Sequence, residues 1–323
     1  MSDVSVVVCA YTLDRWDDLN AAVASVRAQT YPAREVLVVI DGNEALQQRA
    51  ERAIEGVTVV ANTKTAGLSG GRMTGAELAS APIIVFLDDD AVAEQEWLAH
   101  LVEEFEDARV LGAGGHIDPL WRKPMASWFP PEFNWIVGCT YEGMRVRNGQ
   151  VRNLMGANMA VRADVIRRTG GFASKLGRRE GGGAVIGLVA ESCEETEFCI
   201  RASGVFPGGI WRYCPQARIR HVVPAQRTTW RYFVHRCRME GTAKAVVTGL
   251  VGSRDGLGSE RRYVLTLARS VVRYICTGQF GRAMAICVGL AITTSAYGRA
   301  RLARAMARTS SNRITPITPI SFL

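Results

Sequence analysis

Three consecutive aspartates, Asp88, Asp89 and Asp90, follow directly on the apolar run 83–87. An apolar run of this length predicts a buried strand, and the carboxyl ends of such strands are where open parallel sheets bind ligands. Two like charges about 5 Å apart repel by roughly 3 kcal/mol at an effective dielectric near 20, so a carboxylate cluster favours a bound cation. Oxygen ligands suit Mg²⁺ or Mn²⁺, usually together with the phosphates of a substrate. By themselves, the aspartates fit a metal site and a solvated acidic helix cap equally well.

Polar and glycine residues also follow the other predicted strands, at the same edge of the expected sheet. Asp41 closes the second predicted strand, and Asn62 opens a loop that continues into GLSGGRMTG at 67–75. Glycines such as Gly70 let the backbone approach a ligand, and Arg72 supplies charge. The segment matches neither the P-loop pattern nor the GxGxxG dinucleotide turn. These residues describe a site for a nucleotide whose diphosphate is held by a metal, although Asp41 is equally explained as a turn residue.

A second group of acidic residues opens the predicted helix 193–204, where Glu194, Glu195 and Glu197 fall in the first turn. The helix macrodipole stabilises carboxylates at this position, so they need no catalytic role. Transfer of a sugar with inversion, however, needs a carboxylate that takes the proton of the acceptor hydroxyl.

His221, at the end of an apparent strand, is either a structural histidine or a ligand that completes a Mn²⁺ site.

The elements that position these residues alternate between strands and helices, which predicts a mostly parallel sheet with right-handed crossovers. The predicted strands are 4–9, 36–40, 57–60, 83–87 and 217–220, and the predicted helices are 17–31, 46–54, a short one after the loop 62–71, 94–106, 163–169 and 193–204. In the Trp- and Pro-rich stretch 119–135, Trp121, Trp128 and Trp135 either pack in the core or stack on a sugar. The five glycines of 177–187 indicate a mobile lid or a plain flexible loop.

The net charge of +8 is concentrated near the carboxyl end. After Glu260 there are ten arginines and no acidic residue; the 39 basic groups less these ten leave 29 against 31 acidic groups in residues 1–260. Such a tail suits an anionic surface, and we expect phospholipid rather than nucleic acid. Sixteen uncharged residues between Arg282 and Arg299 fall short of the ~20 that span a bilayer, which favours helices lying in the membrane plane. Docking on the catalytic domain or on a partner subunit is the alternative.

Length and cysteine usage bound the class of protein. The chain of 323 residues, 48% of them hydrophobic, can hold one large domain or two smaller ones. Its eight cysteines form no CxxC pair and no zinc spacing, which predicts reduced, mostly buried thiols. The first apolar stretch, 4–9, is too short for a signal peptide, so we expect a cytoplasmic protein, peripheral at the cytoplasmic face of the membrane.

Taken together, the motifs resemble those of glycosyltransferase family 2, the inverting nucleotide-sugar enzymes with a GT-A fold. The resemblance covers roughly residues 4–245 and rests on VVVCAYTLDR, VLVVIDGN, NTKTAGLSGGRMTG, IIVFLDDDA, GANMAVR with GGF, and CEETEFCIR, in this order. The chain departs from the pattern at Met73, where many members have Asn, and at Glu195, where many have Asp. It also lacks the arginine before Trp230 that a QxxRW box requires, which disfavours a processive polysaccharide synthase.

The resemblance implies a GT-A type, Rossmann-like α/β fold with a mostly parallel sheet flanked by helices and a basic helical C-terminal extension. It implies a catalytic domain over 1–245, divided into a nucleotide-sugar half (1–115) and an acceptor half (116–245); the remaining residues, 246–323, form the basic extension that we expect to associate with a membrane. The expected donor-binding residues are Ala10, Tyr11, Thr12, Arg15, Asp41, Asn62, Gly70, Arg72, Asp88 and Asp89. The resemblance implies Asp88 and Asp90 as ligands of a Mn²⁺ or Mg²⁺ ion, and His221 is the candidate third ligand that its own position suggests. The implied base is Glu195 or Glu194.

The resemblance further implies a UDP-, GDP- or dTDP-sugar donor and a hydroxyl acceptor on a glycan or on a polyprenyl-phosphate-linked sugar. Members with a similar CEET segment resemble enzymes that extend polyprenyl-phosphate sugars. Two alternatives stay open. A sugar-nucleotide pyrophosphorylase would carry a GxG and a lysine near the first strand, where this chain has AYTLDR. A non-catalytic binder of anionic surfaces would use the arginine-rich tail alone.

Overall fold

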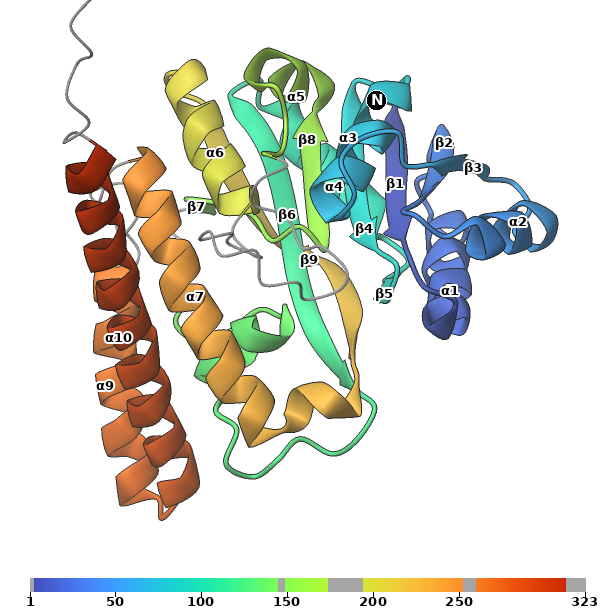
Figure 1. Cartoon of the computed structure of the whole chain (residues 1–323). Coiled ribbons are helices and arrows are strands. Elements are labelled where there is room, and N and C mark those ends of the chain that lie inside the picture. The colour runs from blue at the N-terminus through green and yellow to red at the C-terminus, as the bar shows by residue number, and fades with distance from the viewer. Residues whose placement is uncertain (1–2, 145–148, 174–193, 252–259, 312–323) are drawn as a thin grey trace, which may run out of the picture.

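The first half of the chain forms a parallel sheet, as the alternation of apolar runs predicts. We describe the chain from a computed structural model that covers residues 3–144, 149–173, 194–251 and 260–311 (Figure 1). The first four strands are β1 (Val4–Ala10), β2 (Glu35–Ile40), β3 (Thr58–Ala61) and β4 (Ile83–Asp88). Their order is β3-β2-β1-β4, and all three pairings are parallel. Their carboxyl ends therefore meet at one edge, where Cys9 of β1 lies opposite Asp88 of β4.

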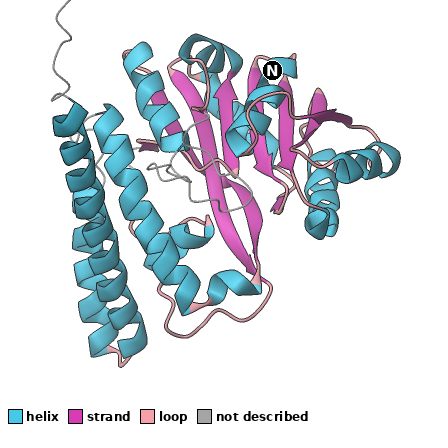
Figure 2. Ribbon diagram, in the orientation of Figure 1, coloured by secondary structure: helices cyan, strands magenta, loops and turns pink. Residues whose placement is uncertain are grey.

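Helices connect these strands and cover the sheet (Figure 2). They are the short η1 (Leu13–Arg15), α1 (Trp16–Arg27), α2 (Glu44–Ala53) and α3 (Leu68–Leu78). Val6 and Val8 belong to one hydrophobic cluster and Val7 to another, because successive side chains of a strand point to opposite faces. The predicted loop 62–71 is partly wrong, since α3 begins at Leu68 and carries Gly70 and Arg72 inside the helix.

The second half of the sheet is mixed in direction, and the sequence did not predict most of it. It consists of β5 (Ala91–Ala93), β6 (Val110–Trp121), β7 (Gln150–Val151), β8 (Asn158–Arg162) and β9 (Ile210–Val223). The nine-stranded sheet continues from β4 as β8-β6-β9-β5, with β7 also paired to β9, and β8 runs antiparallel to both of its neighbours. Strand β6 escapes a pattern search because glycines replace the alternating side chains. At Gly115 these glycines are required, since a Cβ would lie 1.6 Å from the carbonyl oxygen of Ala217.

The remaining short helices are α4 (Trp97–Glu103), η2 (Glu104–Glu106), η3 (Pro131–Val137), α5 (Ala163–Thr169), α6 (Glu194–Val205) and η4 (Ala225–Thr228). Four of them, α4, η2, α5 and α6, lie near the positions predicted for 94–106, 163–169 and 193–204, whereas η3 and η4 were not predicted. The prediction for 163–169 is confirmed, and Gly170 ends that helix with a φ of 76°. Trp121, Trp128 and Trp135 pack against the main hydrophobic cluster, as the core interpretation expected.

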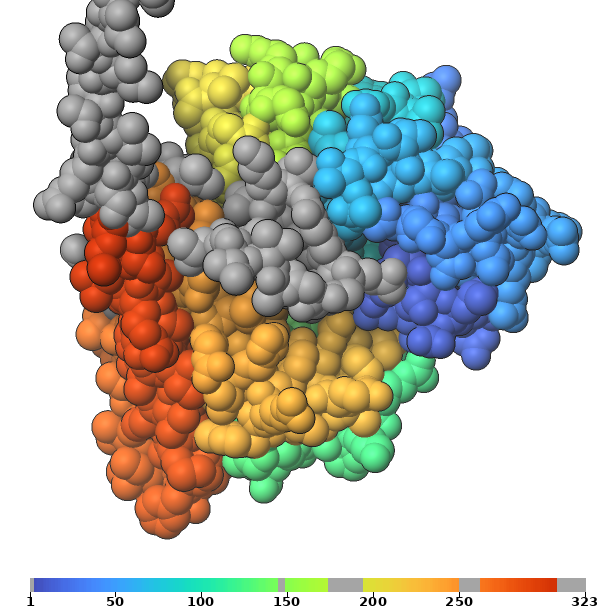
Figure 3. Space-filling view, viewed as in Figure 1, coloured from blue at the N-terminus to red at the C-terminus, as the bar shows by residue number. Residues whose placement is uncertain are grey.

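Three long helices form the C-terminal part: α7 (Trp230–Val251), α9 (Glu260–Cys276) and α10 (Phe280–Ser311). Helix α7 continues through residue 245, where the sequence suggested a domain boundary. Helix α10 packs along α7 and α9, and the space-filling view shows α10 beside α7 (Figure 3). By length and composition, Phe280–Met306 is the one helix among the described residues that could cross a membrane, and 28% of its apolar window is buried.

Helix α9 is held on the catalytic part through a buried carboxylate. Glu132, in η3, is fully buried and accepts hydrogen bonds from Arg273 (3.0 Å) and from the hydroxyl of Tyr274 (3.2 Å). Trp135 donates through Nε1 to the hydroxyl of Tyr263 at 2.9 Å. The extension therefore docks on the catalytic domain, which is the alternative that the sequence had left open beside membrane attachment.

The sequence also made predictions about the cysteines and about the glycine-rich segment 177–187. The seven cysteines within the described ranges are all free thiols, and four of them are buried, in agreement with the prediction of reduced thiols. The eighth, Cys193, lies outside the described residues, as does the glycine-rich segment 177–187 that was predicted as a lid or a flexible loop.

Candidate active site

A cavity of about 820 Å³ lies at the carboxyl edge of the parallel strands. Eleven of the predicted site residues line it: Ala10, Tyr11, Arg15, Asp41, Arg72, Asp88, Asp89, Asp90, Glu194, Glu195 and His221. The volume is within the range of roughly 300–1,000 Å³ that is usual for small-molecule sites. The fold thus brings together nearly all the groups that the sequence singled out for donor binding, metal binding and base catalysis.

Three predicted donor-binding residues do not line this cavity. Thr12 accepts a hydrogen bond from the backbone of Asp14 and caps η1. Asn62 donates to Asp41 at 2.7 Å, so it holds that carboxylate in place. At Gly70 the helix passes the preceding loop so closely that a Cβ would lie 1.8 Å from a carbonyl oxygen. None of these three residues forms part of the cavity wall, and Asn62 acts on the site through Asp41.

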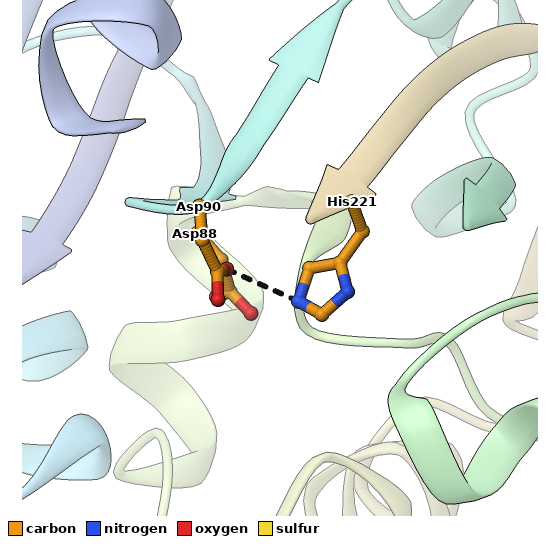
Figure 4. A group of neighbouring side chains, drawn as sticks. All are labelled: Asp88, Asp90 and His221. Atoms are coloured by element: carbon orange, nitrogen blue, oxygen red, sulfur yellow. Dashed lines mark ion pairs between the residues drawn. The ribbon is translucent and has the colours of Figure 1, made fainter. Parts of the chain in front are cut away.

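Asp88, Asp90 and His221 form a candidate metal centre. One ligand atom of each lies within 4.8 Å of the others, and Figure 4 shows the three side chains converging. His221 Nε2 is 3.0 Å from Asp90 Oδ1. The neighbourhood arises because β9 pairs with β5, which places His221 opposite Ala91. Two carboxylates and an imidazole are a donor set that Mn²⁺ accepts, so the residues fit the ion that the sequence predicts.

The local excess of negative charge also fits a cation. Burial and the neighbouring Asp90 raise the pKa of Asp89 to about 7, and one oxygen of Asp89, Oδ2, is buried without a hydrogen-bond partner. Burial alone would raise the pKa of Asp90, but His221 and Arg15 outweigh it and lower that pKa. Arg15 contacts both Asp89 (2.8 Å) and Asp90 (3.0 Å). Arg15 therefore bridges two closely spaced carboxylates, and a bound divalent cation would relieve their repulsion.

Arg72 links the aspartates to the acidic helix α6. Its side chain is only 2% exposed, and it reaches Glu195 at 2.7 Å, Asp88 at 3.3 Å and Glu194 at 3.7 Å. Burial disfavours the charged guanidinium, yet Glu195 and the other carboxylates outweigh it and raise the pKa of Arg72. Burial, followed by the charge of Glu195, raises the pKa of Glu194 to about 8. Glu194 and Glu195 are adjacent in the sequence, but the fold places them in different environments: Glu194 is buried with a raised pKa, and Glu195 is paired with Arg72.

Comparison with known proteins assigns the family. Residues 5–170 match the model of "Glycosyl transferase family 2". The chain belongs to this family. Membership confirms the resemblance, and it excludes a sugar-nucleotide pyrophosphorylase and a non-catalytic binder as alternatives.

This family 2 glycosyltransferase is 34% identical over 248 residues to the "Glucosyl-dolichyl phosphate glucuronosyltransferase" of Haloferax volcanii, covering 76% of this chain and 77% of that protein. It is 26% identical over 181 residues to "Glycosyltransferase AglE" of the same organism, covering 54% and 57% of the two chains.

Solved structures of two other glycosyltransferases share the fold. The structure titled "Mannosyltransferase PcManGT from Pyrobaculum calidifontis in complex with GDP-Man and Mn2+" has a TM-score of 0.57 at 16% identity, and covers 95% of this chain and 89% of that one. The structure titled "Crystal structure of GalNAc-T7 with UDP, GalNAc and Mn2+" has a TM-score of 0.51 at 18% identity, covering 74% and 47%. The GT-A fold expected of this glycosyltransferase is confirmed.

Two further residues of the site were missed by the sequence analysis. Arg227 lines the cavity, and its charge lowers the pKa of Asp90 after the larger effects of His221 and Arg15. Arg227 lies in the segment QRTTW, which the sequence analysis compared only with the QxxRW box. Because its arginine stands at a different position from the one in that box, Arg227 was not considered as a site residue. Gly156 opens the GANMAVR motif, and the backbone there passes directly against the Arg72–Glu195 pair.

We expect Gly156→Ala to reduce activity of the glycosyltransferase without unfolding it. An added Cβ would lie 2.0 Å from Glu195 Oε1 and 2.3 Å from Arg72 Nη2, so this ion pair must shift. Displacements of about 1 Å can cost ~100-fold in rate, and kcat for sugar transfer measures the effect. The control is Gly204→Ala in α6, where a Cβ meets nothing within 4 Å. Equal kcat values for the two variants would contradict the close contact at Gly156.

Proposed function

We propose that this enzyme transfers a sugar, with inversion, from a nucleoside diphosphate donor to a hydroxyl of a sugar carried on a polyprenyl phosphate. The observation that carries the proposal is that the aspartate cluster and the Arg72–Glu195 pair line one cavity. The aspartate cluster suits a donor diphosphate held through a metal, and Glu195 suits an acceptor hydroxyl that must lose its proton. The choice of acceptor is supported by the relative in Haloferax volcanii, whose name specifies a glucosyl-dolichyl phosphate.

Donor binding falls to the residues at the ends of β1, β2 and β4. Asp88, Asp90 and His221 would hold Mn²⁺ or Mg²⁺, which when bound neutralises charge on the diphosphate. Both structural neighbours were solved with Mn²⁺, one with UDP and the other with GDP-Man. Asp41, held by Asn62, faces the cavity as an acceptor for a ribose or base hydrogen bond.

Glu195 is the better candidate for the catalytic base. In the proposed step Glu195 takes the proton of the acceptor hydroxyl while that oxygen bonds to the anomeric carbon, and the bond to the diphosphate oxygen breaks. The Glu195 side chain is 19% exposed in the cavity, whereas that of Glu194 is 5% exposed. A pKa of about 8 leaves Glu194 mostly protonated at pH 7, so it cannot readily accept another proton. Arg72 orients Glu195 through its 2.7 Å contact.

A donor panel tests the proposal directly. The purified chain is incubated with UDP-, GDP- and dTDP-sugars, Mn²⁺ and a polyprenyl phosphate that carries glucose, and nucleoside diphosphate release and glycolipid product are measured. We expect one donor class to give metal-dependent product whose new linkage has the inverted anomeric configuration. Product with retained configuration would contradict the base assignment. Release of nucleoside diphosphate without glycolipid product would contradict the acceptor.

We also propose that the C-terminal helices attach the enzyme to a membrane surface. Large exposed apolar side chains among the described residues gather on α9 and α10: Val264, Leu265, Val272, Ile275, Phe280, Met284, Leu302 and Met306. Arg262 and Arg269 are exposed on α9 as well. Apolar residues flanked by arginines suit an anionic phospholipid interface.

The membrane proposal predicts that Leu265→Glu with Val272→Glu weakens binding to phosphatidylserine vesicles by at least about tenfold, because each inserted side chain contributes about 1.5–3 kcal/mol. Both residues are about 60% exposed, at 61% and 62%, so the fold should persist. Leu78→Glu, at an exposed leucine of α3, is the control. Cosedimentation of the double variant with vesicles at the wild-type level would refute membrane attachment through α9.

A further inference from the structure

The cavity extends beyond the active site onto the C-terminal helices. Helix α7 contributes Tyr232, Arg236, Glu240, Lys244 and Val247 to its wall, α9 contributes Tyr263, Val264 and Leu267, and α10 contributes Leu290, Thr293, Thr294 and Tyr297. Residues spaced by three or four positions share one face of a helix, so each helix presents a single stripe to the cavity. The docked extension thus completes a site whose catalytic end is built by the sheet.

The wall made by α9 and α10 is apolar in its chemistry. Val264 and Leu267 of α9 and Leu290 of α10 contribute aliphatic surface, and the ring of Tyr263 meets that of Tyr141 edge to face, with 5.3 Å between the ring centroids. The threonine hydroxyls on this wall are engaged with their own helix: Thr293 donates to the carbonyl of Gly289 and Thr294 to that of Leu290, each at 2.8 Å. The hydroxyl of Tyr263 donates to the backbone carbonyl of Glu132. A glycan would need free hydrogen-bonding groups here, whereas an isoprenoid chain needs none.

Positive charge lines the same cavity. Arg227 and Arg236 line the cavity, and the Nε of Arg236 is buried without a hydrogen-bond partner. Lys244, two turns further along α7, is paired with Glu240 at 3.1 Å. A buried guanidinium nitrogen without a hydrogen-bond acceptor destabilises the fold unless a ligand supplies that acceptor. The oxygens of a phosphate group can do so in the bidentate geometry that arginine prefers.

We propose that α7, α9 and α10 form the binding site for the lipid carrier of the acceptor, with its phosphate at Arg236 and its first isoprenoid units along Leu267 and Leu290. This inference rests on the proposed function and assigns a place to its acceptor. The sugar of the carrier then points from Arg236 toward Glu195 in the same cavity. The rest of the lipid leaves toward the exposed apolar residues of the same helices, such as Leu265 and Met284, where a membrane would receive it.

Two full-length variants with matched controls test the assignment. Leu290→Trp narrows the apolar wall, and Leu302→Trp changes an exposed leucine of α10 outside the cavity. Arg236→Gln removes the charge, and Arg238→Gln does so on the same helix outside the cavity. The probes are glucose 1-phosphate esterified with a C20 phytanyl chain and the same headgroup esterified with methanol. Metal-dependent release of nucleoside diphosphate without acceptor reports whether each variant is folded and binds donor.

We expect the wild type to prefer the phytanyl probe, and Leu290→Trp to lower this preference in kcat/KM by about tenfold or more. Arg236→Gln should raise KM for the phytanyl probe by about 10- to 100-fold, the effect of losing one charged hydrogen bond, with donor hydrolysis retained. Both controls should behave as the wild type. An unchanged preference in Leu290→Trp with an unchanged KM in Arg236→Gln would overturn the carrier site alone. Absence of transfer by the wild type to either probe would overturn the proposed function together with it.

Discussion

Glu195→Gln should abolish transfer while the enzyme still binds and slowly hydrolyses its donor. The amide keeps the size of the side chain but cannot take the proton of the acceptor hydroxyl, and loss of a general base costs about 10²–10⁴-fold in kcat. The measurement is glycolipid formation at saturating donor and acceptor, beside metal-dependent release of nucleoside diphosphate. Arg72 keeps its contacts to Asp88 and Glu194 in the variant, so the site should not collapse.

Glu194→Gln is the matched control for this experiment. Its carboxyl group has a pKa of about 8, raised first by burial and then by Glu195, so at pH 7 it is mostly neutral and an amide replaces it closely. We expect kcat to change little. A collapse of kcat in Glu194→Gln with normal transfer by Glu195→Gln would reverse the assignment of the two residues.

Asp90→Asn should remove metal-dependent activity, with a loss of more than about 100-fold in kcat/KM, since weakening even the partners of metal ligands costs 10- to 100-fold. Asp90 is buried and contacts both His221 and Arg15 at 3.0 Å, so the variant loses a charge at the centre of the proposed site. Binding of Mn²⁺ should stabilise the wild type by about 2.7 kcal/mol at a hundredfold excess over Kd, and the variant hardly at all. Denaturant unfolding with and without Mn²⁺ measures this without reference to activity.

Asp118→Asn provides a control of the same chemistry elsewhere in the fold. Asp118 also contacts a histidine and an arginine, His116 at 3.2 Å and Arg218 at 2.5 Å, but it does not line the cavity. We expect this variant to keep Mn²⁺-dependent stabilisation. Equal stabilisation of Asp90→Asn and Asp118→Asn by Mn²⁺ would show that Asp90 holds no metal.

The sequence alone predicted which residues gather at the carboxyl edge of the parallel strands. Asp41 and Asp88 follow apolar runs whose length favours buried strands, and parallel strands joined by helices end at one edge of the sheet. This is why residues remote along the chain could be assigned to one site from pattern alone. The family motifs supplied the order of these segments, and the parallel pairings observed for β1, β2, β3 and β4 agree with that expectation.

What the sequence could not determine depends on contacts between segments that carry no local pattern. His221 joins Asp90 only because β9 pairs with β5, and β6 was overlooked because its glycines serve close packing rather than alternation. The difference between Glu194 and Glu195 follows from how far α6 buries each carboxylate. The cavity wall of α7, α9 and α10 exists because Glu132 and Trp135 hold α9 on the domain. Periodicity reports which side chains are buried, but tertiary packing decides what they are buried against.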